Sequence, residues 1–91
     1  MNLLTVTSRL SSDSIARIDY YGAFFLTHND GSIVGASALD DGFELLAYAG
    51  SVDGADFDIY RNEAGLTVVV MHDDLAPTAE DVTEYMGLYD L

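Results

Sequence analysis

The chain has 91 residues, of which 49% are hydrophobic, and it contains no cysteine. This length suits one domain with a modest core, and the apolar content is too high for a disordered acidic tail. The lack of cysteine excludes a disulfide framework and a thiolate metal site. We therefore expect residues 1–91 to form one folded domain.

Charge is the clearest anomaly in the composition. The chain has sixteen acidic residues, three arginines and no lysine, so the formal net charge at pH 7 is −13. Repulsion between so many like charges lowers folding stability. A need for solubility accounts for part of this excess of acidic residues. The arginines, at positions 9, 17 and 61, are scattered along the chain and cannot neutralise a run of phosphates. Direct binding of DNA or RNA is therefore excluded.

The first residues lack a basic segment followed by an apolar run, which is the pattern of a secretory signal. No stretch approaches the roughly 20 apolar residues that a membrane-spanning helix needs. We expect a cytoplasmic protein, either of a cell or of an infected host.

The first part of the chain predicts a strand, an ambiguous segment and a hairpin. Residues 3–7 are rich in leucine and β-branched side chains, which favours a strand. Residues 12–21 follow a polar break that is able to cap a helix, but a strand also fits them. Two apolar runs, 23–28 and 32–35, flank the turn sequence Asn-Asp-Gly, which is typical of a β-hairpin.

The middle of the chain predicts a helix over residues 37–48, because its apolar residues recur at helical spacing. These residues are Leu39, Phe43, Leu46 and Ala47. Asp40, Asp41 and Glu44 then lie on the opposite face, and Gly50 supplies the C-terminal stop.

Residues 55–61 alternate strictly, as in a strand with one buried face. The inward side chains are Phe57 and Ile59, and the outward ones are Asp56, Asp58 and Tyr60. A polar turn and the β-branched run at 66–72 complete a second hairpin. A last helix is predicted from Thr78, with apolar residues at 82, 85, 86 and 89 on one face. Glu80, Asp81 and Glu84 lie away from that face.

Together these elements predict an α+β fold, in which an antiparallel sheet of about five strands carries two or three helices on one face.

No motif in the chain predicts catalysis. Ser, His and Asp are present without a nucleophile elbow, and no glycine-rich segment is followed by lysine as in a phosphate loop. Residues 53–58 hold three aspartates, and residues 72–74 hold a histidine and two aspartates, but Mg²⁺ or Mn²⁺ usually needs a substrate phosphate or a closed cage of ligands as well. We expect neither an enzyme nor a cofactor or metal site, and we interpret these clusters as solvated turns.

The acidity itself is the best functional clue. A compact domain that displays carboxylates at high density resembles the charge of a nucleic acid, so its target is a basic, nucleic-acid-binding groove. The acids expected to contact such a partner are Asp40, Asp41, Glu44, Asp53, Asp56, Asp58, Glu80, Asp81 and Glu84.

In size, acidity, lack of cysteine and α+β pattern, the chain resembles small phage-encoded inhibitors, namely anti-CRISPR proteins and other DNA mimics. The resemblance is one of type, without a shared motif. It implies a viral, non-catalytic inhibitor that occupies the groove of a CRISPR effector or a similar defence nuclease.

Three alternatives remain from the sequence. An antitoxin or immunity protein that plugs a toxic nuclease shares the same electrostatic logic. A salt-adapted housekeeping domain would also be acidic, although such proteins usually carry fewer bulky apolar residues. A homodimerising domain would expose Val68 and Val70, or the face of Tyr85 and Tyr89, as its interface.

Overall fold

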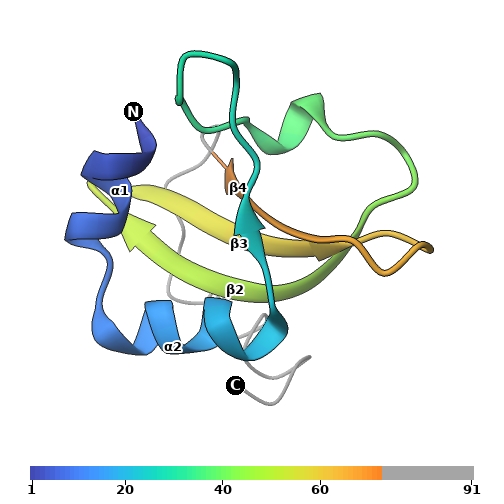
Figure 1. The fold of residues 1–91 in the computed structure, drawn as a ribbon, viewed down its shortest axis with the longest axis horizontal. Coiled ribbons are helices and arrows are strands. Elements are labelled where there is room, and N and C mark those ends of the chain that lie inside the picture. Colours follow the sequence, from blue (N-terminus) through green and yellow to red (C-terminus); the bar gives the residue numbers. More distant parts are fainter. Residues whose placement is uncertain (73–91) are drawn as a thin grey trace.

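The computed structural model describes residues 1–72, so the predicted C-terminal helix with Glu80, Asp81 and Glu84 lies outside the described residues. The elements follow one another along the chain as shown in Figure 1. They are α1 (Leu3–Arg9), α2 (Ser12–Tyr21), β1 (Phe24–Phe25), the 3₁₀ turn η1 (Ala36–Ala38), β2 (Glu44–Val52), β3 (Ala55–Arg61) and β4 (Thr67–His72). Two α-helices and a sheet confirm the α+β class.

The sheet has four strands within residues 1–72, in the order β1-β4-β3-β2. Strands β2, β3 and β4 form an antiparallel meander, whereas β1 pairs with β4 in parallel. The prediction of about five antiparallel strands is therefore wrong in detail, since the sheet is mixed. The predicted pairing of residues 55–61 with residues 66–72 is confirmed by β3 and β4.

Residues 3–7 form helix α1 and not the predicted strand. The Asn2 side chain accepts a hydrogen bond from the Thr5 amide at 3.0 Å and so caps the first turn. Val6 is fully buried and Leu10 is nearly so, which gives the helix one apolar contact line. Packing of these two residues outweighs the weak strand preference of the β-branched side chains.

Residues 12–21 form helix α2, which resolves the ambiguity of the sequence in favour of a helix. Ser11 caps it, because its Oγ accepts from the Ser14 amide at 3.1 Å. Gly22 ends it in the left-handed conformation with φ of 65°, and its amide bonds back to the last turn. Ser14 and Ile18 are the buried side chains of the helix.

Replacing Ser11 with alanine is expected to destabilise the domain by about 1 kcal/mol, because the Ser14 amide then loses its cap. Ser12→Ala, at the exposed first residue of the helix, is the matched control and should change stability little. Urea denaturation of both variants measures the difference. Equal losses in the two variants would show that the cap contributes nothing.

The tight turn around Gly31 is present, but the hairpin predicted around it is reduced to an isolated bridge between Thr27 and Ile33. The His28 amide donates to the Ser32 carbonyl at 2.8 Å and closes the turn. The preceding residues pair with β4 as strand β1, with Phe24 beside Val68. The local turn signal is therefore correct, while the partner of the first apolar run lies far along the chain.

The helix predicted over residues 37–48 is absent from the structure. Only η1 is helical there, and residues from Glu44 onward form the strand β2. Asp40 and Asp41 lie in the loop between them. Gly50, predicted as a helix stop, lies inside β2 with φ of 143°.

The main core lies between the two helices and one face of the sheet. Val6 and Ile18 from the helices join Phe57 and Ile59 of β3 in one buried cluster. This arrangement confirms the predicted inward direction of Phe57 and Ile59. The opposite face of β3 and β4 is also buried, since Val68, Val70 and Asp58 are fully inaccessible. Val68 and Val70 therefore do not form the exposed interface that a homodimer of this chain was expected to use.

Candidate partner-binding surface

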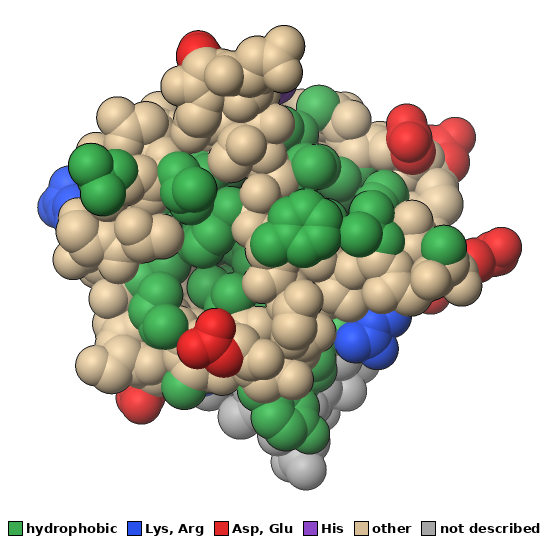
Figure 2. Space-filling model, in the orientation of Figure 1, with side chains coloured by type: hydrophobic (Ala, Val, Ile, Leu, Met, Phe, Trp, Pro, Cys, Tyr) green, Lys and Arg blue, Asp and Glu red, His purple; other side chains and the backbone are tan. Residues whose placement is uncertain are grey.

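Four exposed carboxylates lie at one end of the sheet. Asp40 and Asp41 precede β2, Glu44 is its first residue, and Glu63 lies in the turn between β3 and β4. Glu44 is the cross-strand partner of Arg61, the last residue of β3, so the start of β2 and this turn are adjacent. Figure 2 shows acidic side chains at the right edge of the molecule, and hydrophobic side chains gathered near the centre of the same face. We name these four carboxylates the acidic margin.

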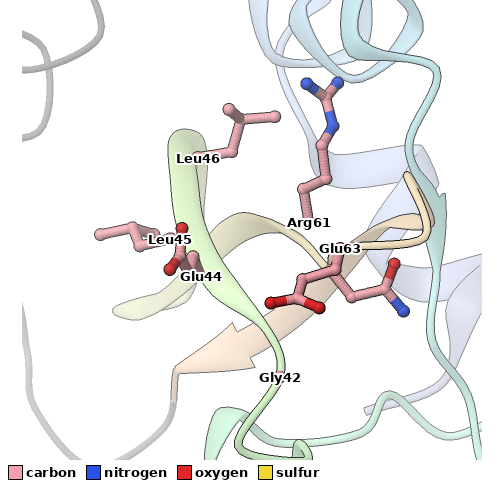
Figure 3. A pocket seen from close by; sticks show the side chains of 7 residues that line it. Gly42, Glu44, Leu45, Leu46, Arg61 and Glu63 are labelled. Atoms are coloured by element: carbon pink, nitrogen blue, oxygen red, sulfur yellow. The ribbon is translucent and has the colours of Figure 1, made fainter.

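The acidic margin borders an open hollow of about 360 Å³, lined by Glu44 and Glu63 and by the half-buried Leu45 and Leu46. Arg61 also lines it, but its guanidinium points away from the two carboxylates (Figure 3). The Arg61 Nε donates instead to the Thr67 hydroxyl at 3.1 Å. Within residues 1–72, neither glutamate forms an ion pair. The hollow therefore combines two carboxylates that form no ion pair within residues 1–72 with the apolar side chains of two leucines.

Asp53 lies at the other end of β2, in the turn that leads to β3. Its carboxylate forms an ion pair with Arg9, which belongs to the last turn of α1. Its backbone adopts a left-handed conformation with φ of 52°, which aspartate tolerates better than most residues. Asp53 is thus exposed as expected, but its charge is compensated and it is separate from the acidic margin.

Asp56 and Asp58 are not surface residues, although the sequence predicts them as partner contacts. Asp56 is 4% exposed and Asp58 is fully buried. Both point away from Phe57 and Ile59, as the alternation predicts, but the face they reach is buried as well. The expected exposure of these two carboxylates, on which their prediction as partner contacts depended, is therefore wrong.

Asp58 is an unusual buried group. Neither of its carboxylate oxygens has a hydrogen-bond partner in the described part of the chain, and the His72 Nδ1 lies 4.0 Å from its Oδ2. Burial raises the pKa of the Asp58 carboxyl from 3.8 to about 6, a protonated His72 opposes this change, and the charge of Asp56 adds to it.

Asp56 has a different environment, since the Tyr48 hydroxyl donates to its Oδ1 at 3.2 Å. Burial raises the pKa of Tyr48, and both neighbouring aspartates act in the same direction. The four polar residues Tyr48, Asp56, Asp58 and His72 share one face of the meander, because Tyr48 pairs with Asp58 and Asp56 pairs with His72. We name them the buried polar cluster.

Sequence reasoning missed the buried polar cluster, although one signal for it was available. Residues 68–70 are three consecutive valines, and an uninterrupted apolar run is typical of a strand that is buried on both faces. A strand paired with β4 then has both of its faces buried. Asp56 and Asp58 of β3 would be expected to face solvent only if β4 also alternated between apolar and polar residues.

Across residues 1–72, no three histidine or acidic side chains are grouped so that they could hold a metal ion. In the same range, no helix has the length and apolar character needed to cross a membrane.

Comparisons with protein-family models, with curated protein sequences and with solved structures find no match to this chain.

Proposed function

We propose that this chain is an acidic inhibitor that binds the nucleic-acid-binding groove of a basic protein, such as a defence nuclease or a CRISPR effector. The observation that carries the proposal is the acidic margin, where four exposed carboxylates gather at one end of the sheet. The net charge of −13 and the absence of lysine support it, because a surrounding negative field steers a basic partner toward that margin.

The hollow beside the margin supports a protein partner in particular. Glu44 and Glu63 offer carboxylates, and Leu45 and Leu46 offer apolar surface close to them. Arginine and lysine combine an apolar stem with a cationic head, so a basic side chain of the partner matches both parts of the lining. Such a contact needs no catalysis, and the inhibitor acts by occupying the groove.

The test compares two variants of equal net charge. D40N/D41N/E44Q removes three charges from the acidic margin, and D13N/D19N/D30N removes three exposed charges elsewhere. The partner is first captured from a lysate of bacteria with active CRISPR systems, at low salt, and eluted by raising the salt. Affinity of the captured basic protein is then measured for the parent chain and both variants.

We expect the margin variant to bind about 10- to 100-fold more weakly and the control variant to lose less than about threefold, because charge next to the contact acts more strongly than remote, screened charge. Equal losses would assign the binding to diffuse charge. Failure to capture any basic nucleic-acid-binding protein at low salt would contradict the proposed function itself.

A further inference from the structure

Three aspartates of the chain are followed directly by glycine, namely Asp30, Asp41 and Asp53. In such a pair the amide nitrogen of the glycine is able to attack the side-chain carboxyl carbon of the aspartate, because glycine has no Cβ to obstruct the approach. All three aspartates are exposed, so exposure alone does not distinguish them. The contacts of their reacting groups do distinguish them.

Both reacting groups of the first pair are already engaged. The Asp30 Oδ1 accepts from the Ser32 amide at 2.9 Å and from the Ser32 hydroxyl at 2.6 Å. The Gly31 amide, which is the attacking group, donates to the His28 carbonyl at 3.0 Å. These hydrogen bonds must break before the Gly31 nitrogen reaches the carboxyl carbon of Asp30.

The Asp53 carboxylate is held by an ion pair. Both of its oxygens accept from the guanidinium of Arg9, at the end of α1. Two charge-assisted contacts made together fix the orientation of the carboxylate as well as its position. Attack by the Gly54 amide therefore requires the carboxylate to leave the guanidinium first.

Asp41 and Gly42 are the central residues of a turn before β2, which the Phe43 amide closes by donating to the Asp40 carbonyl at 3.2 Å. Within residues 1–72, the Asp41 carboxylate forms no hydrogen bond or ion pair, and the Gly42 amide donates no hydrogen bond. A Cβ at Gly42 would meet nothing within 4 Å, so the turn is also open around the glycine. Both reacting groups of this pair are free to meet.

We propose that Asp41 is the site at which this chain forms isoaspartate. The Gly42 nitrogen bonds to the Asp41 Cγ, and the amide proton leaves with the hydroxyl of the protonated carboxyl as water, which closes a succinimide ring. Water then adds its hydroxyl to the main-chain carbonyl carbon of Asp41 and its proton to the Gly42 nitrogen, as the bond between these two atoms breaks. The main chain now runs through the Asp41 Cβ and Cγ, and no atom is gained or lost overall.

Isoaspartate keeps the negative charge of Asp41, but it adds one methylene group to the main chain and leaves the carboxylate on the Cα. Asp41 belongs to the acidic margin, so the change falls on the surface that we propose for partner binding. The reaction itself requires no partner, and its test is therefore independent of the proposed function.

The experiment incubates the folded chain in warm, mildly acidic buffer, digests it, and quantifies isoaspartate at each of the three sites by enzymatic methylation and peptide mass spectrometry. A hydrogen bond or ion pair that must break before a reaction slows it, by about tenfold for a contribution of ordinary size. We therefore expect Asp41 to convert at least about tenfold faster than Asp30 or Asp53. In guanidinium chloride the three sites should convert at similar rates, since each is then an unrestrained Asp-Gly pair.

Two variants test the cause of the selectivity. R9Q should raise conversion at Asp53 about tenfold and leave Asp41 unchanged, because it frees the Asp53 carboxylate. G42A should slow conversion at Asp41, since the added methyl group obstructs the attacking nitrogen, and there is open space for this methyl group in the fold. No change at Asp53 in R9Q would contradict the protective role of the ion pair.

Conversion of Asp30 or Asp53 as fast as that of Asp41 in the folded chain would overturn the proposal. So would an equal lead of Asp41 in guanidinium chloride, because the local sequence and not the fold would then select the site.

Discussion

Replacing Gly50 with alanine is expected to destabilise the domain by about 3 kcal/mol. Gly50 lies inside β2 with φ of 143°, a conformation that residues with a side chain rarely adopt. A Cβ there would overlap the Ser14 hydroxyl and lie 3.0 Å from the Ser14 Cβ. Ser14 cannot easily move, because it is buried and its hydroxyl lies 2.9 Å from the capping Ser11 hydroxyl. The free-energy cost of backbone strain and the free-energy cost of overpacking therefore add in this variant.

Gly54→Ala is the matched control for this prediction. Gly54 also has a positive φ, of 82°, but a Cβ at this position meets nothing within 4 Å. Only the backbone strain remains, so we expect a loss of about 1 kcal/mol. Denaturant unfolding of both variants isolates the contribution of the close approach between α2 and β2. Similar losses in the two variants would show that α2 yields to the added methyl group.

Phe57→Ala is expected to remove about 4 kcal/mol of stability. The Phe57 ring is fully buried on the helix-facing side of β3 and makes an edge-to-face contact with Phe25, with 6.4 Å between ring centroids. Its loss leaves a cavity between the helices and the sheet. A chain of this length has roughly 5–14 kcal/mol in total, so thermal unfolding should begin at a markedly lower temperature.

Phe24→Ala provides the comparison, because Phe24 belongs to the same sheet but is 51% exposed. We expect it to lose less than about 1.5 kcal/mol, since much of its side chain contacts solvent in the folded state. Calorimetry of both variants at one pH measures the two losses. A Phe57 variant as stable as the Phe24 variant would mean that the core lies elsewhere.

The β3–β4 hairpin was predictable because its signals are local and consistent. Strict alternation in residues 55–61, a polar turn, and a β-branched run all favour the same structure. The N-terminal segment is the opposite case. Its β-branched residues favour a strand, yet capping by Asn2 and burial of Val6 select a helix. The Asn2 cap is local, but the burial of Val6 depends on contacts with the rest of the fold, which a local pattern does not contain.

Strand β2 was hidden by its own irregularities. Its register against β3 shifts between Leu45 and Ala47 and again between Tyr48 and Gly50. Each irregularity interrupts the alternation of apolar and polar residues on which recognition of a strand depends. Its buried residues include Ala47 and Ala49, whose small side chains belong to the same core cluster as Val6 and Ile18 of the helices. The spacing of the apolar residues that remains in residues 37–48 also fits a helix.

The candidate site was predictable where exposure follows from a turn or loop. Asp40, Asp41 and Glu44 are exposed as expected, even though the helix predicted to carry them is absent. Glu63 joins them only through the pairing of β2 with β3. Asp56 and Asp58 were placed wrongly because alternation identifies two faces of a strand without saying which of them meets water.

The strand order also has a kinetic meaning. Strands β2, β3 and β4 join through short turns, so their pairing closes small loops and is able to form early. Among residues 1–72, strand β1 pairs with β4 alone, a partner more than 40 residues away, and contributes two residues. Its docking closes the largest loop for the fewest backbone hydrogen bonds. We infer that the meander nucleates folding, and that the edge formed by β1 is added late and detaches first.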